Sequence, residues 1–281
     1  MNTRHWNLIQ GFALAALFPL FAACSSEGDE LLQSEEKQPV QVAIGTRATM
    51  DGDEWTWENG DQIGLNVTSH GATSPTNYTL TYSSSAWNNN SFTVTLPGTI
   101  EAWYPGGTGT SPDSFTIPTD QSTYANLCKA DFMTYSGKLD SMNPSLTLEH
   151  RLSKVTVTIT HWEDYGETMP EISNFIIQTS GTITISDGIV AGSGSTDITP
   201  LYDETDKSYA AIIAPGSGFD IKLTVNGKDK TAHYDGSLDS GDAYSFNLTL
   251  AENELVFDLE GNEMFEGWGK EEDEEVIEAI N

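Results

Sequence analysis

Short stretches of the sequence alternate between apolar and polar residues, which is typical of β-strands with one buried face. In residues 40–44, for example, Val40, Val42 and Ile44 share one face of an extended chain. Similar or β-rich runs predict strands at residues 40–44, 63–67, 78–82, 92–96, 146–148, 154–159, 174–177, 181–185, 209–213, 220–225, 243–250 and 255–257. Only a short segment at residues 124–129 and the C-terminal tail suit a helix. The pattern therefore predicts an all-β chain.

Turn-forming residues separate the predicted strands, as β-hairpins require. They are Asn59-Gly60-Asp61, Pro105-Gly106-Gly107, Asp187-Gly188, Asn226-Gly227 and Asp235-Gly236. A chain of 281 residues is long enough for two ordinary domains, so we expect two β-sandwiches in tandem, of Greek-key and transthyretin-like type. The polar stretch near residues 161–170 is the expected boundary, giving sandwiches at 48–162 and 163–270. The same composition also suits a long loop within one domain.

The N-terminus has the features of a secretory signal that is cut before a lipid-bearing cysteine. Arg4 precedes an apolar run from Gly11 to Ala23, and Cys24 follows. The alternatives are a transmembrane helix or a plain signal peptide with a chance cysteine. The run is shorter than the roughly 20 residues of a membrane span, and Pro19 interrupts it. We therefore predict that residues 1–23 are removed and that Cys24 carries lipid, which leaves Cys128 as a buried thiol.

The strongly acidic composition excludes some classes of partner. The net charge is −30, and removal of residues 1–23, with one arginine and no acid, makes it −31. Such a surface repels phosphate backbones and anionic lipid heads. The sequence therefore argues against nucleic-acid binding, and the lipid must supply any membrane attachment.

An ordered set of segments after Cys24 resembles the fimbrillin-like family, the Mfa-like lipoprotein pilins of type V pili. The segments are residues 46–49, 57–65, 104–105, 148–157, 211–216 and 238–250. The resemblance covers most of the chain after the signal. It implies an exported pilus subunit at the outer membrane and cell surface of a Gram-negative bacterium, with a role in cell adhesion. The acidic residues after Cys24 agree with outward exposure, although acidic linkers are also simply solvated.

In the resembled family, pilins assemble by exchange of β-strands after an arginine-specific protease has cut the chain. By resemblance, the cut falls between Arg47 and Ala48. Residues 24–47 would then be a lipidated linker with a removable strand, in which Val40, Val42 and Ile44 fill a groove of their own subunit. The alternative is an ordinary exposed arginine in a flexible linker. The implied partners are other pilin subunits, the lipoprotein processing machinery, the protease and a surface receptor.

The acidic tail at residues 271–281 is the expected donor strand for a neighbouring subunit. It ends in a short apolar stretch that contains Val276 and Ile280. The spacing of these two residues also suits a helix packed on its own domain, and the charge suits a disordered tail. These alternatives stay open on sequence alone.

The sequence gives little reason to expect an enzyme. The five histidines lack metal-ligand spacing, no nucleotide-binding or nucleophile motif occurs, and we expect no metal or cofactor. His150 and Arg151, before a predicted strand, suit a hydrogen-bonded strand entry better than a binding pair. The main alternative to a pilin is a monomeric surface lipoprotein that binds glycans, with Trp87 beside Asn88-Asn89-Asn90 as an exposed stacking platform.

Overall fold

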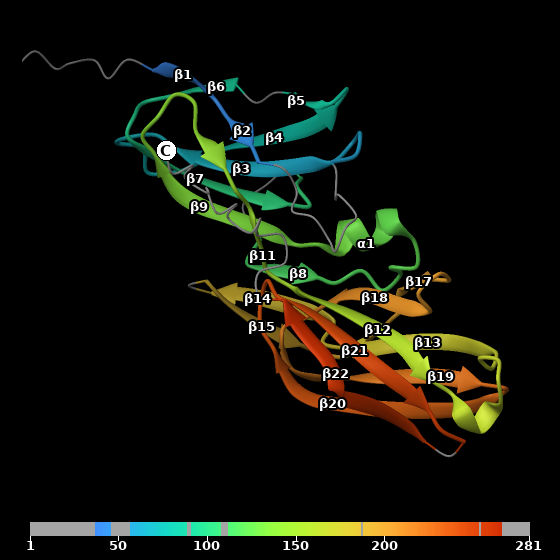
Figure 1. Ribbon diagram of the computed structural model, residues 1–281. Coiled ribbons are helices and arrows are strands. Elements are labelled where there is room, and N and C mark those ends of the chain that lie inside the picture. The colour runs from blue at the N-terminus through green and yellow to red at the C-terminus, as the bar shows by residue number, and fades with distance from the viewer. Residues whose placement is uncertain are drawn as a thin grey trace, which may run out of the picture. The chain divides into compact units, whose positions relative to one another are not determined.

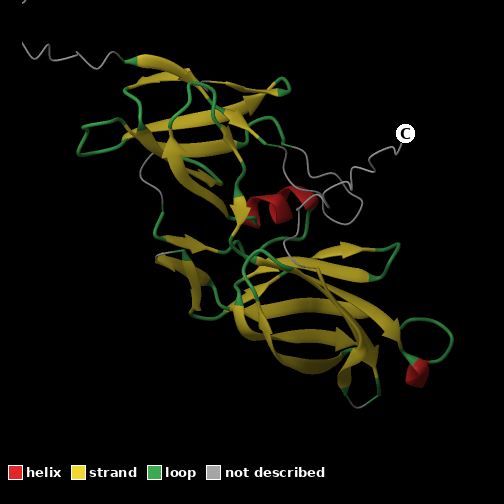
Figure 2. Cartoon of the chain, turned by 60° about the vertical axis from the view of Figure 1, so that its left-hand side comes forward, coloured by secondary structure: helices red, strands yellow, loops and turns green. Residues whose placement is uncertain are grey.

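A computed structural model describes residues 37–45, 57–88, 91–107, 112–186, 188–252 and 254–265 of the chain. Nearly all of them form strands or the loops between strands (Figures 1 and 2). The all-β prediction is confirmed, whereas the Greek-key, transthyretin-like type stays a prediction. Within the described ranges, no helix is long and apolar enough to cross a membrane.

The first group of strands surrounds a core that residues 40–146 supply. Its largest sheet has six strands in the order β11-β9-β7-β3-β4-β5. Two smaller pairs, β1-β6 and β2-β10, contribute side chains to the same core. The strands are β1 (Gln38–Gln41), β2 (Ala43–Ile44), β3 (Gln62–Thr68), β4 (Thr76–Ser83), β5 (Ala86–Asn88), β6 (Ser91–Val94), β7 (Gly98–Tyr104), β9 (Met133–Leu139), β10 (Ser145–Leu146) and β11 (Glu149–His150).

The second group of strands surrounds a larger core. It comprises a five-stranded sheet in the order β17-β18-β12-β21-β22, a four-stranded sheet β16-β13-β19-β20 and a three-stranded sheet β15-β14-β8. The strands are β8 (Ser114–Thr116), β12 (Ser153–His161), β13 (Ile172–Thr179), β14 (Thr182–Ser186), β15 (Ile189–Ser193), β16 (Thr196–Ile198), β17 (Leu201–Asp203), β18 (Ser208–Ile213), β19 (Gly216–Val225), β20 (Lys228–Leu238), β21 (Ala243–Leu250) and β22 (Leu255–Phe265). A 3-10 turn, η1 (Glu163–Tyr165), follows β12.

Strict alternation explains the central strands of the second group. Every second residue of β21 is buried, from Tyr244 to Leu250, and Val155 and Val157 of β12 are buried in the same way. Because successive side chains of a strand point to opposite faces, such a sequence buries one face and leaves the other polar. β12 and β21 pair in parallel and lie side by side in Figure 1.

The segment between β7 and β9 belongs to the second core, although these strands lie in the first sheet. It contains β8, which pairs with β14, and the short helix α1 (Tyr124–Ala130), which the sequence predicted. The Thr123 hydroxyl caps α1 by accepting from the Asn126 amide, and Leu127 and Cys128 are buried. Helix starts favour a threonine in this position because its oxygen satisfies an otherwise unpaired amide.

The expected division at residues 162–163 stays a prediction. β12 lies before that point in the sequence and contributes its buried side chains to the second core, as do residues 115–132. One turn prediction was wrong, because Asp235 and Gly236 lie within β20. A Cβ on Gly236 would lie 2.2 Å from the Tyr234 hydroxyl, so the glycine makes room for this ring.

Candidate functional site

The N-terminal segment from Gln38 to Gly45 lies between two strands of its own subunit. β1 pairs antiparallel with β6, in a register that aligns Val40 with Phe92. β2 pairs in parallel with β10. The segment therefore links β6 to β10, and Figure 1 shows β1 beside β6. Its backbone fills a place that would otherwise expose two strand edges.

Backbone hydrogen bonds hold the segment along residues 142–146. The amides of Gln41, Ala43 and Gly45 donate to three carbonyl oxygens at 2.8, 2.9 and 3.0 Å. The acceptors are Met142, Pro144 and Leu146. Every second amide is used, as expected for a strand that pairs on this side.

Side chains anchor the segment to the first core. Val40 and Val42 have no exposed surface, and the half-buried Ile44 packs against the same core. Gln41 and Ala43 are exposed. Full burial of two valines stabilises this arrangement by about 3 to 6 kcal/mol, to which the backbone bonds add. Withdrawal of the segment would leave an apolar groove with unpaired backbone groups.

An aromatic cluster closes the end of the segment. The Trp57 indole nitrogen donates to the Gly45 carbonyl at 3.3 Å. The Trp57 ring makes edge contacts with Trp87, at a centroid distance of 4.9 Å, and with Tyr104, at 5.3 Å. The Tyr104 hydroxyl in turn donates to Asp61 at 3.0 Å. The turn after Trp57 therefore positions the indole ring against Gly45, at the end of the segment.

The predicted site residues divide into two sets. Val40, Val42 and Ile44 come together on one face of the segment, as described above, and their role in strand exchange stays a prediction. Cys24, Arg47, Ala48, Val276 and Ile280 lie outside the described residues. The role of the carbonyl groups of residues 142–146 was not predicted, because backbone acceptors leave no signal in a sequence. The bond from Trp57 to Gly45 was also missed.

Trp87 is not the exposed loop residue that the sequence suggested. It lies in β5, is half-buried and contacts both Trp57 and Tyr82 by ring edges. Asn88 belongs to the same strand, whereas Asn89 and Asn90 lie outside the described residues. The ring therefore serves as packing for the first core.

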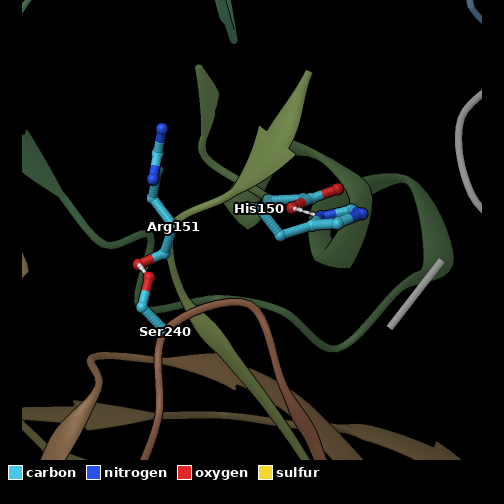
Figure 3. Close-up of polar contacts among 4 residues, drawn as sticks. His150, Arg151 and Ser240 are labelled. Carbon is cyan, nitrogen blue, oxygen red and sulfur yellow. Dashed lines mark hydrogen bonds and ion pairs between the residues drawn. The ribbon is translucent and has the colours of Figure 1, made fainter. Parts of the chain in front are cut away.

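His150 and Arg151 form a hydrogen-bonded joint between the two groups of strands. The His150 ring nitrogen lies 2.7 Å from the buried Asp131 carboxylate, and the Arg151 Nε donates to the Thr134 hydroxyl at 2.6 Å. The Arg151 carbonyl accepts from the Ser240 hydroxyl at 3.0 Å. In Figure 3 the two side chains point away from one another. This geometry confirms the strand-entry interpretation.

The described residues show no centre for catalysis by a metal. Among them, no three His, Cys, Asp or Glu side chains gather in a way that could hold a metal ion. The N-terminal segment is a short strand inserted between β6 and β10, and recognition of an extended segment by strand edges is a general mode of binding between proteins.

A model of the fimbrillin-like family matches residues 46–261. No curated protein sequence matches the chain significantly.

Three solved structures share the fold at low sequence identity. A proposed cell adhesion protein of Bacteroides uniformis ATCC 8492 is 17% identical, with a TM-score of 0.59 over 82% of this chain and 98% of its own. A proposed cell adhesion protein of Bacteroides ovatus ATCC 8483 is 16% identical, with a TM-score of 0.60 over 83% and 98%. The C-terminally truncated tip fimbrial protein Mfa3 of Porphyromonas gingivalis is 8% identical, with a TM-score of 0.51 over 82% and 100%.

Proposed function

The chain belongs to the fimbrillin-like family, and from this premise we propose that it is a structural, non-catalytic subunit of a surface pilus that supports cell adhesion. Its subunits join by exchange of β-strands. The observation that carries the proposal is the N-terminal segment, in which Val40 and Val42 are fully buried between β6 and β10.

Delivery and release are the first steps of the proposed assembly. Lipid on Cys24 holds the exported chain at the outer membrane while the N-terminal segment fills its own groove. An arginine-specific protease then cuts between Arg47 and Ala48. Before the cut, the segment is tethered to its groove, and such a tether gives it a high effective concentration against any competing strand.

After the cut, the groove can accept a strand from a neighbouring subunit. If the groove stayed empty, the burial of the two valines and the hydrogen bonds to residues 142–146 would be lost, at a cost of several kcal/mol. The incoming strand has to restore both. A donor with apolar residues at every second position meets both needs. We propose the C-terminal tail, with Val276 and Ile280, as that donor.

The contacts of Ala251 and Glu252, the base from which β22 and the tail extend, support this role for the tail. Before β22, the buried Lys230 ammonium donates to the carbonyls of Ala251 and Glu252 at 2.9 and 2.8 Å. The Tyr165 hydroxyl also donates to Ala251, at 3.3 Å. β22 then pairs with β21 at the edge of the five-stranded sheet. A firmly held base lets the residues beyond it reach another subunit without unfolding their own.

The alternative of a monomeric glycan binder centred on Trp87 loses its main support. The ring packs against Trp57 and Tyr82 and offers no open stacking platform.

N-terminal sequencing of the native surface protein tests the proposal. We expect the assembled protein to begin at Ala48 and to form SDS-resistant ladders. Arg47→Lys should keep the lipidated Cys24 and lose the ladders. Arg151→Lys is the matched control, because it changes the only other arginine after residue 23 and should leave cutting and ladders intact. Surface protein that begins at Cys24 and never forms multimers would overturn the proposal.

A further inference from the structure

An open pocket of about 670 Å³ lies on the second group of strands. It is lined by residues that include Asn174 and Phe175 of β13, Thr199, Tyr202 of β17, Lys207 and Tyr209 of β18. None of its lining residues belongs to the first core, so it is distinct from the groove of the N-terminal segment. Its volume lies within the range of about 300–1,000 Å³ that is usual for small-ligand sites.

Three aromatic rings in contact form one wall of the pocket. Phe175 and Tyr209 are nearly parallel, at 3.7 Å between centroids and 8° between planes. Tyr202 lies against Tyr209 at 4.7 Å and 33°. The first two rings are buried, whereas Tyr202 is 42% exposed. The buried rings therefore fix the outer ring and leave it available to a ligand.

Polar groups lie beside this aromatic wall. β13 changes register between Ser173 and Ile176, and Asn174 adopts the left-handed conformation with φ of 52°. A bulge of this kind re-aims a side chain at the edge of a sheet. Thr199 adds a hydroxyl, and Lys207 adds an ammonium. Burial, with a smaller contribution from Tyr202, raises the pKa of Tyr209 from 10.0 to about 12, so its hydroxyl stays a neutral donor.

The charged residues in and near the pocket limit the class of ligand that it can bind. The chain has 42 acidic residues, yet no aspartate or glutamate lines the pocket. A cationic ligand would meet the Lys207 ammonium, and no carboxylate, among the lining residues of the pocket. An anionic ligand is disfavoured by the net charge of −30 and by Asp203, Glu204 and Asp206 in the turn before Lys207. What remains is an uncharged molecule with an apolar face and several hydrogen-bonding groups.

We propose that this pocket binds an uncharged oligosaccharide, with one pyranose ring stacked on Tyr202 and its hydroxyls bonded to Asn174, Thr199 and Lys207. The inference deepens the adhesive part of the proposed function, because it names the class of receptor. It does not depend on the N-terminal groove or on the cut at Arg47.

Binding to the full chain tests the inference. The protein would be kept in an amine-oxide detergent, which has no sugar head group. The probes are mannotriose, maltotriose and N-acetyllactosamine, measured by saturation-transfer NMR and titration calorimetry. We expect binding of at least one probe, a loss of at least tenfold in affinity for Tyr202→Ala, and retained affinity for Tyr202→Phe. Asn174→Gly keeps the backbone conformation and should also weaken binding.

Ile189→Ala is the control, because Ile189 is 71% exposed in β15 and does not line the pocket. It should bind as the unaltered chain does, and thermal melting should show that all variants stay folded.

The inference is overturned if no probe binds, or if Tyr202→Ala binds as tightly as the unaltered chain. Tighter binding of sialyllactose than of lactose would overturn the uncharged class. Tyr202→Ala should still form SDS-resistant ladders, so failure of binding and failure of assembly are separate results.

Discussion

The side chain of Gln121 takes the place of a neighbouring strand for the backbone of Ile212. Its Nε2 donates to the Ile212 carbonyl at 2.9 Å, and its Oε1 accepts from the Ile212 amide at 2.8 Å. Pairing between β17 and β18 ends at Ala210, so both groups of Ile212 need another partner. The fully buried Gln121 thus fastens the segment between β7 and β9 to the second core.

Gln121→Leu should therefore be strongly destabilising. The leucine fills a similar volume but leaves a buried amide and a buried carbonyl without partners, which costs about 2 to 4 kcal/mol in the free energy of unfolding. Urea denaturation measures this loss. Gln178→Leu is the control, because Gln178 bonds to Asp197 in an exposed pair and should change stability by less than about 0.5 kcal/mol. Equal effects of the two changes would contradict the proposed role of Gln121.

Val42→Asp should unseat the N-terminal segment, because a carboxylate in an apolar core lacks a partner and costs several kcal/mol. We expect the amides of residues 41, 43 and 45 to exchange hydrogen for deuterium at least tenfold faster. Gln41→Asp places the same charge on the exposed face and should leave exchange unchanged. If both variants behaved alike, the buried valine face would not be what holds the segment.

Gly64→Ala should disturb the first sheet, because a Cβ there would lie 2.1 Å from the Trp103 ring. Displacement of that ring should cost about 1 to 3 kcal/mol and alter tryptophan fluorescence. At Gly107 no atom lies within 4 Å of the added carbon, so Gly107→Ala serves as the control. Unchanged fluorescence and stability for Gly64→Ala would show that the sheet adapts without cost.

Stability should fall as the pH rises from 10 towards 12. Burial raises the pKa of Tyr209 to about 12, so the folded chain keeps a proton that the unfolded chain loses near pH 10. Its contribution is fully present below pH 10 and is lost as the pH passes through 12. Tyr209→Phe should make the decline shallower without abolishing it, because burial also raises the pKa of Tyr244. Urea midpoints measured across this pH range provide the test.

Alternation in the sequence predicted the strands whose two faces differ sharply. β12 and β21 are examples, with Val155, Val157, Phe246 and Leu248 all buried. β20 was missed because its exposed positions are strongly polar and because Asp235-Gly236 has the composition of a turn. In the folded protein these two residues lie within a strand, and the missing side chain at Gly236 leaves room for the Tyr234 ring.

The sequence predicted the segment that fills the candidate groove, but not the parts of the chain that flank it. Period-two spacing placed Val40, Val42 and Ile44 on one face, but nothing local indicates that β6 and residues 142–146 flank them. Such pairing is set by contacts between residues that are 50 to 102 positions apart in the sequence. Trp87 shows the reverse error, because neighbouring asparagines suggested a loop while its contact with Trp57 makes it a packing residue.

The packing of residues 114–132 in the second core sets the order in which the chain can fold as it is synthesised. The first core is complete once residue 150 has been made, because all of its buried members precede that point. By then Leu127 and Phe132 have already been made, yet Ile183 and Ile212 of their own core have not. A nascent chain thus carries an apolar segment that must wait, looped out from a finished domain, for strands still to come.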